Sequence, residues 1–107
     1  MNKSSFHKLV KIKAAKLILY TSHAVKQMNS EKRMITTNEV QDIVDNGAII
    51  EYYPEDKRGA SCLIAGKVKN RYIHVVCTPK DDYLAIITAY IPDPEKWDET
   101  FKKRKSK

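Results

Sequence analysis

The sequence predicts an α+β fold in which N-terminal helices pack on a four-stranded antiparallel meander sheet and a short helix closes the chain. Two observations lead to this prediction: helix-capping signals occur before Gly47, and β-rich runs separated by short turn-forming clusters follow it. With 107 residues, of which 42% are hydrophobic, the chain can bury one modest core. We therefore expect a single domain over residues 1–107.

Composition narrows the partners and the compartment. Lys and Arg number 20 against 13 Asp and Glu, which gives a formal net charge of +7. This excess favours polyanions such as RNA, although charge does not by itself separate nucleic acid from a membrane surface or an acidic protein. Cys62 and Cys77 are too few for a disulfide framework and lack metal-ligand spacing. The cysteine usage therefore favours a reducing cytoplasm, and we expect neither a cofactor nor a metal. No apolar run suits a signal peptide or a membrane span, so we expect no membrane contact.

The first two helices are expected before residue 29. Residues 4–16 mix apolar side chains with lysines and suit an amphipathic helix, which would form a basic N-terminal extension over residues 1–16. The Val and Ile residues within it leave a strand open for part of this segment. Thr21 and Ser22 then offer an N-cap to a helix over residues 23–28.

The third helix has signals at both of its ends. Thr36, followed three residues later by Glu39, has the form of a capping box. The helix should run to about Asn46, and Gly47 stands where a C-cap residue in the left-handed conformation is expected.

The remainder of the chain predicts the sheet and the closing helix. The expected strands are short β-rich runs that follow one another directly and so form an antiparallel meander: residues 48–53, 61–68, 71–78 and 83–91. Residues 95–103 suit a short helix in which Trp97 and Phe101 share one face. Residues 102–107 are expected to form a frayed basic tail.

Side-chain alternation along the strands predicts which residues meet. The turn at residues 69–70 pairs Cys62 with Cys77 on the core face, where two thiols packing as small hydrophobic groups are expected more often than a disulfide. Placing the wholly apolar set of each strand on one face pairs His74 with Thr88 and Tyr72 with Tyr90. Four side chains with polar tips should then converge near the middle of the opposite, solvent-reachable face: Tyr72, His74, Thr88 and Tyr90.

That polar group of residues has the parts needed to cleave RNA without a metal. The reaction needs a base for the 2′-hydroxyl, an acid for the leaving 5′-oxygen and donors for the charged phosphorane. His23 and His74 are the natural proton-transfer pair, because histidine titrates near neutrality. Thr88 and Tyr90 can hold phosphate or orient a histidine, and Arg33 can neutralise phosphate oxygens.

Each of these residues also has a purely structural interpretation. A strand histidine is often a satisfied core group, a first-turn histidine can make local hydrogen bonds, and Thr and Tyr suit ordinary strands. Charge runs at chain ends are usually solvated. The basic tail nevertheless adds Lys102, Lys103 and Arg104 as candidate RNA phosphate contacts.

Three strings in the chain resemble a known family: YTSHA at 20–24, RYIHVV at 71–76 and ITAYIPD at 87–93, followed by Trp97. Together they resemble DUF4258, a bacterial family of small domains of unknown function, over residues 17–104. This resemblance implies kinship with RelE/BrnT-type ribonuclease toxins, in which a helical start packs on an antiparallel sheet. It also implies mRNA cleavage controlled by an antitoxin, and it points to the same five positions: His23, Arg33, His74, Thr88 and Tyr90.

The chain departs from the family pattern at the end of the first motif. The family usually has an arginine just before Met28, where this chain has Gln27, and the connection to Arg33 is longer than usual. The leading prediction is a metal-independent, toxin-like endoribonuclease controlled by an acidic or DNA-binding antitoxin. A non-catalytic RNA-binding module and a protein-interaction domain on the same scaffold are the alternatives.

Overall fold

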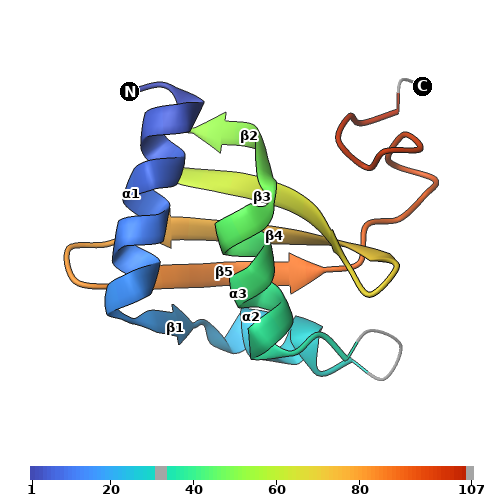
Figure 1. Ribbon diagram of the computed structural model, residues 1–107, viewed down its shortest axis with the longest axis horizontal. Helices are drawn as coiled ribbons and strands as arrows, with labels where there is room; N and C mark the ends of the chain where they lie inside the picture. Colours follow the sequence, from blue (N-terminus) through green and yellow to red (C-terminus); the bar gives the residue numbers. More distant parts are fainter. Residues whose placement is uncertain (31–33, 106–107) are drawn as a thin grey trace.

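A computed structural model describes residues 1–30 and 34–105 and confirms the α+β class (Figure 1). Within these residues the sheet has five strands, in the order β1-β5-β4-β3-β2. The elements follow one another along the chain as α1 (Lys3–Lys16), β1 (Ile18–Tyr20), α2 (Ser22–Met28), α3 (Thr37–Asn46), β2 (Ala48–Tyr53), β3 (Ser61–Val68), β4 (Arg71–Pro79) and β5 (Leu84–Tyr90).

The predicted antiparallel meander is present as β2 to β5, but the sheet is mixed because β1 pairs in parallel with β5. Strand β1 is only three residues long, and Ile18 lies opposite Leu84. A segment this short carries no periodic signal, and its partner is distant along the chain, so local pattern did not predict it.

Capping chemistry fixes the helices where the sequence indicated. The Thr36 side chain and Glu39 form the predicted capping box at the start of α3. The prediction for Gly47 is wrong in its reason, because its φ is −76° and therefore not left-handed. Glycine is needed there because two backbone carbonyl groups approach it closely: an added Cβ would lie 2.6 Å from the Ile43 carbonyl oxygen and 2.8 Å from that of Ala65.

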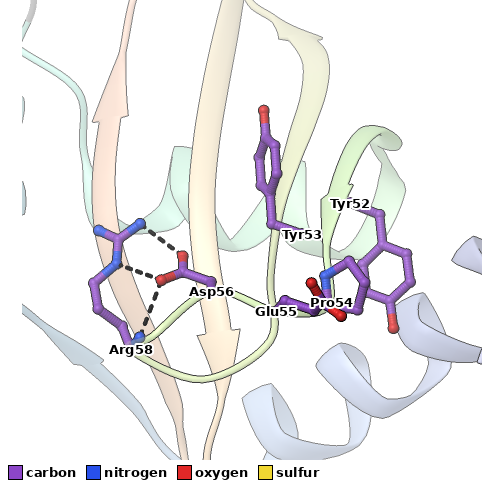
Figure 2. Close-up of a pocket in the computed structure, with 6 residues that line it drawn as sticks. All are labelled: Tyr52, Tyr53, Pro54, Glu55, Asp56 and Arg58. Carbon is purple, nitrogen blue, oxygen red and sulfur yellow. Dashed lines mark hydrogen bonds and ion pairs between the residues drawn. The ribbon is translucent and has the colours of Figure 1, made fainter.

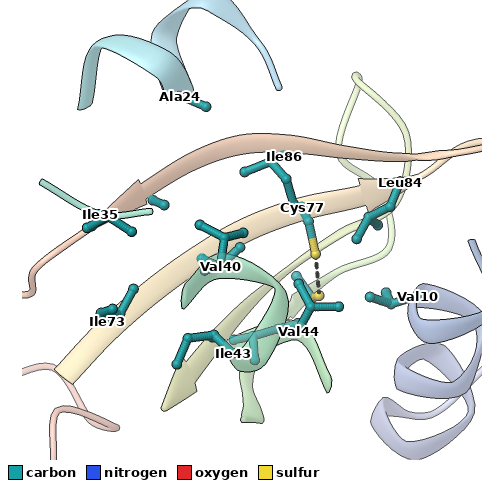
Figure 3. Packing of buried hydrophobic residues seen from close by; sticks show 14 of the residues in the cluster. Val10, Ala24, Ile35, Val40, Ile43, Val44, Ile73, Cys77, Leu84 and Ile86 are labelled. Carbon is teal, nitrogen blue, oxygen red and sulfur yellow. Dashed lines mark hydrogen bonds between the residues drawn. The ribbon is translucent and has the colours of Figure 1, made fainter. Parts of the chain in front are cut away.

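Helices α1 and α3 cover one face of the sheet and enclose the main core (Figures 1 and 3). The predicted pairing of Cys62 with Cys77 is confirmed: both thiols are free and buried, and their sulfur atoms lie 3.8 Å apart. The core consists of buried side chains from these helices, α2 and the strands, among them Phe6, Val10, Met28, Val40, Ile43, Val44, Ile64, Ile73, Val75, Leu84 and Ile86.

The predicted register between β4 and β5 is wrong. His74 lies opposite Tyr90, and Thr88 lies opposite Val76. The next pair is Cys77 with Ile86, so Ile87 is an extra residue in β5 and forms a bulge. A bulge reverses the alternation of side chains, which lets Ile86 join the main core while Thr88 and Tyr90 occupy the other face.

The predicted closing helix is also wrong: residues 92–105, called here the C-terminal segment, form turns and one isolated bridge between Trp97 and Arg104. Asp98 explains the difference, because its side chain accepts hydrogen bonds from the backbone amides of Thr100 at 3.1 Å and Lys102 at 3.2 Å. Such local bonds compete with a helix. Trp97 is only 3% exposed.

The C-terminal segment covers part of the sheet face opposite the helices. The Trp97 ring centroid lies 4.5 Å from that of His74, and the Phe101 ring lies 4.8 Å from that of Tyr72. Figure 1 shows this segment beside the end of β5 and away from α1. Among the described residues, no helix is long and apolar enough to cross a membrane.

Candidate functional site

A single threonine positions helix α2 beside the bulge of β5. As the N-cap of α2, the Thr21 hydroxyl accepts a hydrogen bond from the Ala24 amide at 3.0 Å. It also donates a hydrogen bond to the Ile87 carbonyl at 2.9 Å. The Thr21 amide also donates to the Ile86 carbonyl at 3.1 Å. These bonds satisfy the carbonyl of the bulge residue and hold the first turn of α2, with His23, next to β5.

A polar hollow of about 470 Å³ opens at this junction. It brings together His23, Thr88, Tyr90 and Arg104, four of the predicted site residues, from α2, β5 and the C-terminal segment. The remaining lining residues were not predicted as site residues: Gln27, Ile91, Asp93, Lys96 and Trp97. Lys96 and Asp93 lie in the C-terminal segment, whose turns no periodic pattern indicates, so sequence reasoning missed them.

His74 lies behind this hollow and is 0% exposed, so the prediction of a solvent-reachable ring is wrong. Its Nε2 lies 2.6 Å from the Phe101 carbonyl oxygen, and its Nδ1 lies 3.3 Å from the Tyr90 hydroxyl. Since a carbonyl only accepts, Nε2 carries the proton of the neutral ring and Nδ1 accepts from Tyr90. Burial lowers the pKa of His74, which keeps the ring neutral.

Tyr90 links the buried histidine to the hollow. Its hydroxyl donates to His74, its ring meets the imidazole edge to face with centroids 5.3 Å apart, and it lines the hollow. Burial raises the pKa of Tyr90, so its phenol stays protonated at neutral pH.

Arg104 carries positive charge at the hollow, but it already has an acidic partner. Its Nε and Nη2 donate to the two carboxylate oxygens of Glu51 at 2.8 Å and 3.0 Å. Its guanidinium also stacks over Trp97, 4.6 Å from the ring centroid. Hydrogen bonding to Arg104 lowers the pKa of Glu51, and the arginine side chain is 61% exposed.

The other predicted cations are not brought into this hollow. Arg33 lies outside the described residues. Lys102 is exposed and lines a different hollow with Gly66 and Tyr72. Lys103 is exposed, and the lining of the polar hollow does not include it.

A second hollow of about 560 Å³ lies where β2 ends (Figure 2). Tyr52 and Tyr53 point to different sides of the chain there, and Asp56 pairs with Arg58 at 2.8 Å. Hydrogen bonds from Arg58 lower the pKa of Asp56 well below its ordinary range. None of the predicted site residues lines this hollow.

Fold and site together define a small α+β domain with a mixed sheet and a polar, partly cationic hollow at one edge. The family model described as "Domain of unknown function (DUF4258)" matches residues 20–91, and the chain belongs to this family. The match includes His23, His74, Thr88 and Tyr90, whereas Arg104 lies beyond it. Comparison with curated proteins and with solved structures gave no match.

Proposed function

We propose that this protein binds RNA in the polar hollow and cleaves it without a metal, by transesterification at the 2′-hydroxyl. The observation that carries this proposal is the meeting of His23, Thr88, Tyr90 and Arg104 in one hollow from three separate segments. The net charge of +7 supports a polyanionic substrate.

Each group has a role that its surroundings allow. His23 is exposed, and as a neutral imidazole it accepts the proton of the 2′-hydroxyl. The 2′-oxygen then bonds to phosphorus and the bond from phosphorus to the 5′-oxygen breaks. Tyr90, kept protonated by burial, turns its hydroxyl from Nδ1 of His74 to that leaving oxygen and gives it the proton. The products are a 2′,3′-cyclic phosphate and a free 5′-hydroxyl.

The remaining groups hold the phosphate and orient the acid. The guanidinium of Arg104 and the ammonium of Lys96 offset charge on the phosphorane, and the Thr88 hydroxyl donates to it. His74 serves as a positioning residue, because its Nδ1 holds the Tyr90 hydroxyl. This role differs from the direct proton transfer that the sequence suggested for His74.

RNA binding without cleavage is the second candidate. It is favoured by the pairing of Arg104 with Glu51 and by the presence of Asp93 in the hollow, both of which reduce the positive charge offered to a phosphate. Control by an acidic or DNA-binding antitoxin, kinship with RelE/BrnT-type toxins and a cytoplasmic location remain predictions.

The test is to incubate the purified protein with end-labelled RNA in the presence of EDTA and to analyse the ends. We expect 2′,3′-cyclic phosphates, and we expect His23→Gln to lower the cleavage rate at least ~100-fold while RNA is still retarded on a gel. The matched control is His7→Gln, since His7 bonds the Val44 carbonyl and does not line the hollow. Salt-dependent retardation without products would favour the binding module, and no retardation would reject both candidates.

A further inference from the structure

The C-terminal segment separates His74 from the hollow, and it contacts the imidazole through Phe101 and Trp97. The Phe101 carbonyl occupies the Nε2 of His74 at 2.6 Å, and Trp97 covers the imidazole edge to face. Phe101 has a φ of 58°, a conformation that bulky side chains rarely adopt. The residue that seals His74 is therefore held against its own backbone preference.

The segment is folded back on itself as a closed loop. The Asp98 amide donates to the Lys103 carbonyl at 2.8 Å, and the Lys105 amide donates to the Lys96 carbonyl at 2.9 Å. Opening the loop therefore frees amides whose hydrogen exchange reports on it.

The ion pair between Arg104 and Glu51 fastens this loop to the sheet. Arg104, next to the end of the loop, bonds both carboxylate oxygens of Glu51 on β2 and stacks on Trp97. The pair is partly exposed, with 61% of the Arg104 side chain and 21% of the Glu51 side chain accessible, so water and salt weaken it. Guanidinium binds phosphate in the same forked geometry as carboxylate.

We propose that the C-terminal segment is a strap opened by substrate: a phosphate group of RNA in the hollow takes Arg104 from Glu51, which releases the segment and uncovers His74. Arg104 suits this exchange because it lines the hollow and holds Glu51 at the same time. The purpose of this regulation rests on the proposed function, but the strap itself can be tested without any cleavage.

The first test uses no RNA. Diethyl pyrocarbonate modifies the unprotonated nitrogen of an imidazole, so exposed His23 reacts in every state, whereas the fully buried ring of His74 reacts only when the C-terminal segment leaves it. We expect Glu51→Gln to raise the ratio of His74 to His23 labelling, read by mass spectrometry, about fivefold. The control Glu55→Gln makes the same charge change in the exposed loop after β2 and should leave the ratio unchanged. An unchanged ratio in Glu51→Gln, with the fold verified by circular dichroism, would overturn the proposal.

The second test adds a short 2′-O-methyl oligouridylate, which offers phosphates but cannot be cleaved at the 2′-oxygen. At saturation, shown by fluorescence anisotropy, it should shift the emission of Trp97 to the red and speed hydrogen exchange at the Lys105 amide. Trp97 is the only tryptophan of the chain, so its emission reports on this segment directly. Binding with neither change would refute the strap.

Arg104→Gln separates the strap from a merely structural ion pair. This variant breaks the ion pair, so His74 labelling should rise as in Glu51→Gln. Its affinity for the oligouridylate should fall, however, and bound oligouridylate should no longer change the labelling. Glu51→Gln should instead raise that affinity. Because either charge change alone shifts the affinity for a polyanion, the comparison is with Glu55→Gln: a purely structural pair would give Glu51→Gln and Glu55→Gln the same affinity.

The two proposals fail separately. If the strap responds while natural RNA remains uncut, cleavage is rejected and the strap stands. If RNA is cut and Glu51→Gln matches the wild type in both cleavage and labelling, the strap is rejected and cleavage stands.

Discussion

Replacing His74 by alanine tests the described packing and the proposed chemistry together. The substitution removes the donor to the Phe101 carbonyl and the acceptor of the Tyr90 hydroxyl, both partly buried, and it leaves a void beneath Trp97. Each lost hydrogen bond costs about 1 kcal/mol, and the void adds about 2 kcal/mol. We therefore expect the free energy of unfolding to fall by about 4 kcal/mol.

A domain of this size usually has about 5–15 kcal/mol of stability, so the variant should still fold at low temperature. Urea unfolding is followed by two probes: far-ultraviolet circular dichroism for the whole fold and Trp97 fluorescence for the C-terminal segment. A loss below about 1 kcal/mol would show that the imidazole is not held by these contacts.

The matched variant His74→Gln separates positioning from proton transfer. Glutamine supplies an amide donor for the Phe101 carbonyl but does not titrate near neutral pH. If His74 only positions Tyr90, this variant should retain most of the cleavage rate and the wild-type pH profile. An inactive but stable His74→Gln protein would return His74 to direct proton transfer.

Comparing the wild type with His74→Gln also tests how stability depends on pH. Because burial lowers the folded-state pKa of His74, the unfolded chain binds a proton first as the pH falls. The contribution of the neutral ring is complete above the ordinary pKa of 6.5 and is lost as the pH falls from there toward the folded-state pKa. His74→Gln should lack this part of the slope, and identical slopes would contradict the assigned shift.

Further predictions concern the frame that holds the site. Gly47→Ala should lower the free energy of unfolding by about 2 kcal/mol, because its Cβ would meet two backbone oxygens. Gly66→Ala should lower the free energy of unfolding by less, since its Cβ would meet the end of the Ile43 side chain at 2.7 Å, which can move. Thermal unfolding of both variants checks the order. Burial raises the pKa of Glu39, but hydrogen bonds from Thr36 and Arg71 outweigh this effect, so the net shift of the pKa is downward. The stability that this carboxylate adds should therefore be lost as the pH falls below 4.5. Glu39→Gln should flatten that acid loss, and a variant as acid-sensitive as the wild type would be the contrary result.

Local chemistry made part of the fold predictable. The capping box at Thr36 uses side-chain bonds that reach only three residues along the chain, so its residues suffice to predict it. The short turn at residues 69–70 likewise fixed the pairing of Cys62 with Cys77, because a tight hairpin leaves little choice of register. The sequence also singled out four residues that line the polar hollow, because polar side chains on a basic chain are chemically distinctive: His23, Thr88, Tyr90 and Arg104.

The remainder depended on partners distant in sequence. The bulge at Ile87 reversed the alternation that the register rule assumes, and its carbonyl is satisfied by Thr21, which lies far away along the chain. Asp98 turned the expected closing helix into a loop, and that loop buried a histidine predicted to be exposed.

By itself, the sequence determined the N-caps of α2 and α3 and the four-stranded antiparallel meander, because these follow from interactions between near neighbours. Only the tertiary structure decided which polar groups share the hollow and which are covered. That outcome depends on long-range packing of β1 and the C-terminal segment against β5 and β4, whose free energy no local pattern records.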